Sequence, residues 1–195
     1  MPRALFEYDP PERFVAGTVG EPGQRTFYLQ ASGAGRLTSV ALEKVQVAAL
    51  AERVDAILDE VLRQSAGAQA PTVAPMALDD LAPLDTPITE DFRVGTLSLA
   101  WAPDDQRLVI EAYAAPVTDD EPDPGQLEDE SEDDEEDPDA DSDLLRVRLT
   151  AAAARAFAKR ALAVVGAGRP ACPFCSLPLD PAGHVCPRQN GYRRR

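Results

Sequence analysis

The pattern of hydrophobic and polar positions runs through the same series of elements twice. Apolar and β-branched residues dominate two neighbouring runs in the first half, at 13–20 and 24–31, and two in the second half, at 91–101 and 106–113. The short segment between each pair of runs combines proline with glycine or aspartate. Such turn residues between two β-rich runs indicate a hairpin. Each half therefore begins with two predicted antiparallel strands.

A third strand and a helix follow each predicted hairpin. The third strands are expected at 37–42, where apolar residues are frequent, and at 144–149, where apolar and basic residues alternate. A helix is predicted over 45–64, because its apolar residues recur at steps of three and four and form one helical face. These residues are Val47, Leu50, Val54, Ile57, Leu58, Val61 and Leu62. The second helix is predicted over 151–165, with Thr150 as its N-cap and glycines ending it.

The repeated order predicts an α+β protein built from two β-β-β-α repeats in a pseudo-two-fold arrangement, with a small zinc knuckle at the C-terminus. The first repeat covers 1–65 and the second covers 87–168. A linker rich in alanine and proline, at 66–86, joins them, and the knuckle with a basic tail occupies 169–195. An internal duplication of this kind constrains the whole architecture.

The motif Phe-x-x-Gly-Thr occurs once in each repeat, with Phe14 and Gly17 in the first and Phe92 and Gly95 in the second. One interpretation is that these residues line a symmetric ligand cleft between the repeats. The favoured interpretation is that the phenylalanines belong to the core. Glycine within a strand then permits a bulge or the close approach of another segment.

The negative charge of the chain is concentrated in one segment. The net charge is −15, yet residues 119–143 hold 16 acidic residues and no basic ones. The other 18 acidic residues face 19 basic ones. A segment with so few apolar residues cannot offset the entropy of ordering, so the acidic insert at 119–143 is predicted to be disordered. It is interpreted as a solvating spacer, with mimicry of a nucleic-acid backbone or tethering of a basic partner as sharper alternatives.

The N-terminus lacks the apolar core of a secretory signal, and no apolar run approaches the ~20 residues of a membrane helix. The protein is therefore expected in the cytoplasm, without a membrane partner. Three cysteines close together in a ligand-like pattern suit a reducing compartment better than a disulfide framework.

All three cysteines and the single histidine lie within fifteen positions, as Cys172, Cys175, His184 and Cys186. Thiolates and imidazole are the ligands of tetrahedral zinc, and a Cys-x-x-Cys pair closes around one side of the ion. Four protein ligands would fill the coordination shell, so the predicted zinc is structural and not catalytic. A redox-active Cys-x-x-Cys is the alternative, but it normally opens a helix after a strand.

A basic end follows the ligands, and its residues are candidates for binding a partner: Arg188, Tyr192, Arg193, Arg194 and Arg195. Arginine can hold phosphate and tyrosine can stack on a base. A protein partner is nevertheless the first expectation, because charge alone supports only non-specific attraction.

Several segments together resemble an actinobacterial family known as domain of unknown function 3090, also labelled "repeat protein". These segments are residues 14–20, 25–31, 42–47, 92–96 and 172–194. The resemblance covers nearly all of the chain outside the linker and the acidic insert, and it agrees with the duplication. It implies no activity and therefore no catalytic residue.

Three hypotheses of function follow. The first is a zinc-binding interaction or adaptor protein without catalysis. The second is a nucleic-acid-associated or ribosome-associated protein that uses the knuckle and the arginine tail. The third is an enzyme with a carboxylate-based site between the repeats, which would need a polar cleft with perturbed acids. The sequence favours a non-enzyme, since it contains no GxGxxG, P-loop, GxSxG or HExxH motif.

Overall fold

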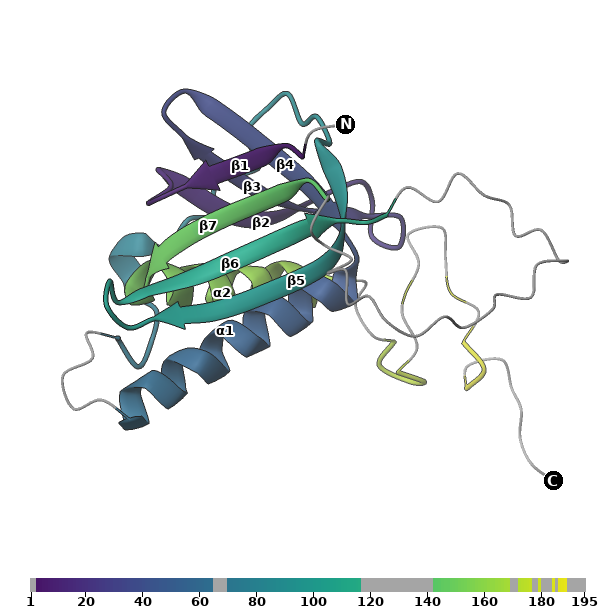
Figure 1. The fold of residues 1–195 in the computed structure, drawn as a ribbon. Helices are drawn as coiled ribbons and strands as arrows, with labels where there is room; N and C mark the ends of the chain where they lie inside the picture. The colour runs from purple at the N-terminus through teal and green to yellow at the C-terminus, as the bar shows by residue number, and fades with distance from the viewer. Residues whose placement is uncertain are drawn as a thin grey trace, which may run out of the picture.

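A computed structural model describes residues 3–64, 70–116, 142–168, 172–176, 179, 184 and 186–188. In these residues, seven strands and two helices make up the body of the protein, with one short 3-10 helix between them (Figure 1). The elements, in chain order, are β1 (Leu5–Tyr8), β2 (Arg13–Val19), β3 (Thr26–Gly33), β4 (Arg36–Leu42), α1 (Lys44–Gln64), η1 (Met76–Leu78), β5 (Phe92–Ala102), β6 (Arg107–Ala114), β7 (Leu144–Thr150) and α2 (Ala151–Gly166).

The strands form one mixed sheet in the order β1-β7-β6-β5-β4-β3-β2. Neighbours within β2-β3-β4 and within β5-β6-β7 are antiparallel, whereas β4 pairs with β5 and β1 pairs with β7 in parallel. The parallel pairing of β4 with β5 is short and joins only two pairs of residues. The predicted α+β class is confirmed, with both hairpins, both third strands and both helices in the predicted order.

The helix α1 follows the predicted periodicity closely. Its buried side chains recur at three- and four-residue steps and face the core: Val47, Leu50, Ala51, Val54, Leu58 and Val61. The first turn is closed by Gln46, whose side chain accepts a 2.8 Å hydrogen bond from the backbone N–H of Glu43. That contact is one half of a capping box, and it satisfies a donor outside the helix.

The helix α2 begins at the predicted N-cap. The hydroxyl of Thr150 accepts a 3.2 Å hydrogen bond from the N–H of Ala153. Most of the buried face of α2 is alanine, with Phe157 stacked on Phe14 of β2 at 4.6 Å between ring centroids. Small side chains let two helices approach closely, and α1 and α2 lie directly against each other.

The sheet is strongly curled, because its two edge strands are consecutive in the chain. A flat sheet of seven strands would separate β1 from β2 by roughly 29 Å. The five-residue step from Tyr8 to Arg13 spans at most about 18 Å. Contacts across the curl bring β1 over β4, where the hydroxyls of Tyr8 and Thr38 lie 2.7 Å apart. Arg36 donates a 2.9 Å hydrogen bond to the carbonyl of Glu7 in the same region.

The strand β1 was not predicted, because four residues are too short for a clear alternating pattern. Its position depends on the far end of the sheet. The N–H of Ala4 donates to the carboxylate of Asp143 at 2.7 Å, and the N–H of Leu144 donates to the carbonyl of Ala4 at 2.9 Å. Asp143 directly precedes β7 and Leu144 begins it, so β1 is ordered by a partner almost 140 residues away.

The two units β2-β3-β4-α1 and β5-β6-β7-α2 stand in the same order along the sheet and share one hydrophobic core. The predicted pseudo-two-fold axis between them and the predicted domain boundaries stay predictions. The interpretation of the Phe-x-x-Gly-Thr motif agrees with the structure. Gly95 lies at a bulge in β5, where a Cβ atom would come within 2.8 Å of the backbone of Ala115.

The segment predicted as a linker packs against the body at both ends. Near its start, Ala70 joins the core and the carbonyl of Pro71 accepts a hydrogen bond from Arg155. Residues 79–85, here called the strap, cross the β2 edge beside α2. Leu84 covers Gly17, where a Cβ atom would lie 2.5 Å from the Leu84 Cγ. Two hydrogen bonds join Asp85 to the side-chain amide of Gln30. The Asp85 N–H donates to Gln30 Oε1 at 2.7 Å, and Gln30 Nε2 donates to the Asp85 carbonyl at 3.1 Å. Glycine at position 17 thus permits the close approach of the strap.

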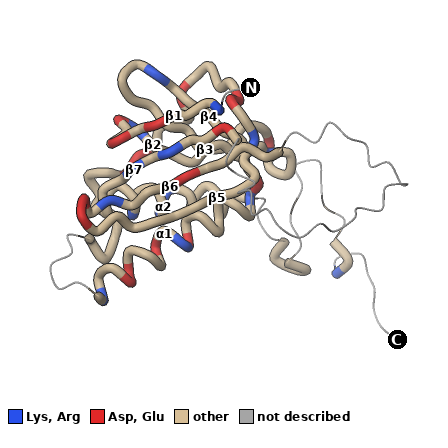
Figure 2. Tube along the Cα trace, in the orientation of Figure 1, with Lys and Arg blue, Asp and Glu red and all other residues tan. Residues whose placement is uncertain are grey.

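Acidic and basic residues are interspersed over the strands and helices of the body (Figure 2). The predicted disordered insert falls on residues 119–143, of which all but the last two lie outside the described part of the chain. No helix among the described residues has the length and hydrophobicity needed to span a bilayer.

Candidate metal centre

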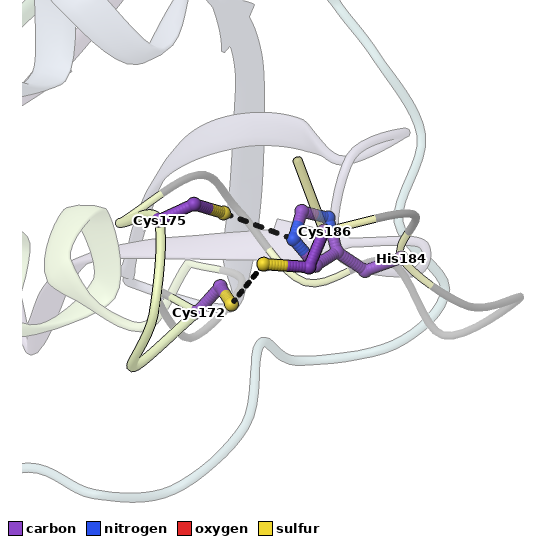
Figure 3. A group of neighbouring side chains, drawn as sticks. All are labelled: Cys172, Cys175, His184 and Cys186. Atoms are coloured by element: carbon purple, nitrogen blue, oxygen red, sulfur yellow. Dashed lines mark hydrogen bonds between the residues drawn. The ribbon is translucent and has the colours of Figure 1, made fainter. Parts of the chain in front are cut away.

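The four predicted ligands converge on one point although they come from two separate stretches of chain (Figure 3). The ligand atoms of Cys172, Cys175, His184 and Cys186 all lie within 4.8 Å of one another. Cys172 and Cys186 are buried, whereas Cys175 and His184 are partly exposed. Cys172 and Cys175 come from the Cys-x-x-Cys turn. His184 and Cys186 come from a second stretch, which begins after eight intervening residues. The group could hold a metal ion.

The spacing of the sulfur atoms fits a tetrahedral site. Two thiolates bound to one zinc ion at ~2.3 Å, with a tetrahedral angle between them, lie ~3.8 Å apart. The Sγ atoms of Cys172 and Cys186 are 3.8 Å apart. A disulfide would bring them to about 2.05 Å, and none of the three cysteines forms a disulfide. The Sγ of Cys175 and the Nε2 of His184 are 3.1 Å apart, closer than the ~3.5 Å of a zinc-bound pair. Metal binding would therefore widen this contact slightly.

Hydrogen bonds within the first turn prepare Cys172 as a thiolate. Burial acts to raise the pKa of its thiol, but backbone N–H groups of Phe174 and Cys175 and the side chains of Cys175 and Cys186 outweigh it and lower the pKa to about 6. The turn is closed by a 2.8 Å hydrogen bond from the N–H of Ser176 to the carbonyl of Cys172. Ser176 has a φ of 62°, in the left-handed region that glycine adopts most readily.

The second stretch is tied to the first by Arg188. Its Nη1 donates a 2.9 Å hydrogen bond to the carbonyl of Phe174. Phe174 itself is 55% exposed, at the tip of the Cys-x-x-Cys turn. The structure shows that Arg188 braces the turn, whereas its role in binding a partner stays a prediction. The other predicted partner-binding residues, Tyr192 and Arg193 to Arg195, lie outside the described residues.

The chemistry open to this arrangement follows from its ligand count. Three thiolates and one imidazole occupy all four positions of a tetrahedral ion, which leaves no protein-free position for a water or substrate. Such a site stabilises the local fold, because the short segments around it have few other ways to hold together.

A second polar cluster, which sequence reasoning missed, lies where the strap crosses the body. Arg13 Nε donates to Asp80 Oδ2 at 2.6 Å and its Nη1 donates to Asp85 Oδ2 at 2.9 Å. Arg160 of α2 donates to Asp80 Oδ1 at 2.8 Å and to the carbonyl of Ala16 at 2.9 Å. The hydrogen bond from Arg13 lowers the pKa of Asp80, against the opposing effect of burial. No local pattern indicates this cluster, because its members lie far apart in the sequence. Arg13 and Asp80 are separated by 67 positions, and Arg160 and Ala16 by 144.

A family model described as a protein of unknown function (DUF3090) matches residues 6–186. The match extends from β1 to the last of the four candidate ligands. No curated protein and no solved structure matches the chain.

Proposed function

The chain belongs to the DUF3090 family of proteins of unknown function, and from the geometry of its site we propose that it is a non-catalytic interaction protein organised by a structural zinc ion. The observation that carries this proposal is the convergence of three cysteine sulfurs and one histidine nitrogen within 4.8 Å. In this proposal the metal knuckle, which follows the body in the chain, is the part that binds a partner.

Zinc is the proposed metal because of the donor atoms. Three thiolates and an imidazole form a soft set, and a tetrahedral arrangement of sulfur and nitrogen is typical of structural zinc. The 3.8 Å separation of the Cys172 and Cys186 sulfurs supports this choice, since it equals the edge of a zinc-centred tetrahedron.

Two features support a role without catalysis. The four ligands would close the coordination shell, so the ion could not activate a water molecule. The carboxyl group of Asp80, in the cluster between the strap and the body, has its pKa lowered by Arg13 and is held ionised. A carboxylate in that state suits an ion pair better than proton donation.

The proposed partner is in the first place a protein, bound through the exposed side of the knuckle. Phe174 is a large apolar side chain on a turn that a metal would make rigid, and such residues are effective anchors in interfaces. The proposed location is the cytoplasm, where reducing conditions keep the thiols available for metal, in agreement with three cysteines that form no disulfide.

A nucleic-acid partner is the second candidate, favoured by the pairing of Phe174 with Arg188. An exposed aromatic ring can stack on an unpaired base, and an adjacent guanidinium can contact phosphate. Affinity for single-stranded RNA should then fall steeply with salt concentration and drop on a Phe174→Ala exchange.

Metal analysis tests the zinc proposal directly. We expect about one zinc ion per chain in protein purified without a histidine tag, because the four candidate ligands together form one tetrahedral site. Cys186→Ser and His184→Ala should each lose the ion, whereas Ser176→Ala, beside the ligands but without a ligand atom, should keep it. Cobalt substitution should give the absorption of a tetrahedral thiolate site. Intact, reduced protein without bound metal would overturn the proposal.

Partner capture tests the second part. Zinc-loaded protein and its Phe174→Asp variant, both with full metal content, are compared as baits, and bound protein and bound RNA are identified separately. Loss of a specific protein in the variant supports the first candidate, and loss of RNA supports the second. An unchanged set of bound molecules would show that the knuckle surface is not the docking site.

A further inference from the structure

A cavity of about 640 Å³ lies where the start of α1 and the end of α2 meet the turn between β2 and β3. Phe27 and Val165 belong to the apolar part of its lining, and Arg25 and Lys44 are its charged residues. The described residues that line the cavity include no acid. Pockets for small organic molecules measure roughly 300–1,000 Å³, so this cavity has the size of a ligand site.

Arg25 reaches the cavity from the turn between β2 and β3 and is half-buried. Its Nη1 donates a 2.5 Å hydrogen bond to the carbonyl of Ala167, the C-cap of α2. A cation at this position is favoured by the negative end of the helix dipole. The contact uses one of the five N–H groups of the guanidinium, and no carboxylate pairs with Arg25 in the part of the chain that the structure describes. Arg25 is therefore held in place with donors left for a ligand.

Lys44, the first residue of α1, adds a second positive charge to the cavity. Its ammonium group forms no hydrogen bond or ion pair with any described residue. The neighbouring acid, Glu43, pairs instead with Arg93 at 3.4 Å. A Cβ atom at Gly168 would lie 3.8 Å from Lys44 Nζ, so the glycine leaves room beside the ammonium group.

The absence of an acid in this described lining distinguishes the cavity from the polar clusters elsewhere on the body. Arg13, Arg146 and Arg160 each contact another element and each pair with an aspartate or a glutamate there. Arg25 and Lys44 face a shared space instead, and two like charges repel each other. An anion between the two side chains would offset this repulsion and accept hydrogen bonds from both.

We propose that this cavity binds a small organic anion, with a carboxylate or phosphate group between Arg25 and Lys44 and an apolar part against Phe27 and Val165. A guanidinium forms two parallel hydrogen bonds with such groups, and an ammonium group adds a compact charge. The volume is larger than an inorganic anion fills, which indicates an organic ligand. The site shares no residue with the four candidate metal ligands, so it does not depend on the proposed zinc ion.

NMR titration of the full-length protein tests the proposal through the amide signals of Gly23, Gly166 and Gly168, which line the cavity. The probes are inorganic phosphate, phenyl phosphate and benzoate at constant ionic strength. We expect saturable shifts, with phenyl phosphate binding about 10-fold more tightly than inorganic phosphate because its ring adds apolar contact. The tighter of phenyl phosphate and benzoate identifies the preferred charged group. Equal binding of phenyl phosphate and inorganic phosphate would overturn the assignment of an organic ligand.

Three variants locate the binding. Lys44→Gln should weaken it about 10-fold, because a charge-assisted contact is lost while no described hydrogen bond is disturbed. Arg53→Gln is the matched control, since Arg53 is an exposed base on the same helix and does not line the cavity. Gly168→Leu keeps both charges but fills the space beside the Lys44 ammonium, so it should abolish binding. Equal effects of Lys44→Gln and Arg53→Gln, or no saturable shift with any probe, would overturn the proposal.

Discussion

The contact between Gly17 of β2 and Leu84 of the strap can be tested by a double-mutant cycle. In Gly17→Ala the new Cβ would lie 2.5 Å from the Leu84 Cγ, far inside the normal separation of two carbon atoms. Leu84 is only 8% exposed, so the strap has to release it. Exposing a buried leucine costs about 1.5–3 kcal/mol. We therefore expect Gly17→Ala to lower the free energy of unfolding by about 2 kcal/mol.

The second arm of the cycle removes the obstacle instead. Leu84→Ala should cost about 2 kcal/mol through lost burial and the cavity left behind. In the double variant the two methyl groups no longer collide, and alanine replaces a glycine within a strand, which is worth about 0.5–1 kcal/mol. The double variant should be no less stable than Leu84→Ala, so that the coupling between the sites is about 2 kcal/mol.

Urea denaturation of the four proteins measures these free energies. Gly166→Ala serves as control, because a Cβ atom there meets no atom within 4 Å and alanine favours the end of α2. Additive effects at positions 17 and 84 would refute the reasoning, since they would mean that the strap does not rest on Gly17.

Three further changes have defined outcomes, the first in urea denaturation, the second in chelator competition and the third in stability measured against pH. Thr150→Ala removes the cap that accepts from Ala153 and should cost about 1 kcal/mol. Ser176→Gly relieves a φ of 62° and should make the zinc-bound form about 1 kcal/mol more stable in chelator competition; a weaker site would contradict this. The hydrogen bond from Arg13 lowers the pKa of Asp80 in the folded state, so its contribution is present above the unfolded pKa of ~3.9 and is lost as the pH falls below it. Asp80→Asn should thus be about 1 kcal/mol less stable at pH ~7, and the difference should shrink as the pH is lowered below ~3.9; a constant difference would exclude the linkage.

Elements with a local signal were predictable from the sequence. The apolar spacing of α1 and the N-cap at Thr150 depend on residues within one or two turns, and the structure shows both where the pattern places them. The candidate ligands were predictable for the same reason, since their chemistry is a property of residue type and short spacing. The bulge at Gly95 and the close contact at Gly17 agree with what glycine inside a strand indicates.

Features that depend on distant partners were not predictable in this way. The strand β1 is ordered by β7, and the strap is held by Arg13 and Arg160 from two different elements. Arg155 of α2 belongs to the same class: its side chain is buried and paired with Asp55 of α1 at 2.6 Å. The helical spacing from Ala151 and Ala158 places Arg155 on the buried face of α2. A charged side chain is rarely buried without a partner, and the partner of this one lies 100 positions away in the sequence.

The sequence by itself determined the fold class, the order of the elements and the four residues that can bind a metal, because each follows from periodicity, turn chemistry or ligand type over a few positions. Only the tertiary structure decided that the sheet curls until β1 lies over β3 and β4, that part of the linker packs as a strap beside α2, and that Leu81 is exposed at an apolar groove. The physical reason is that these arrangements depend on side chains far apart in sequence, whose pairing is chosen by the packing of the whole chain and not by any local preference.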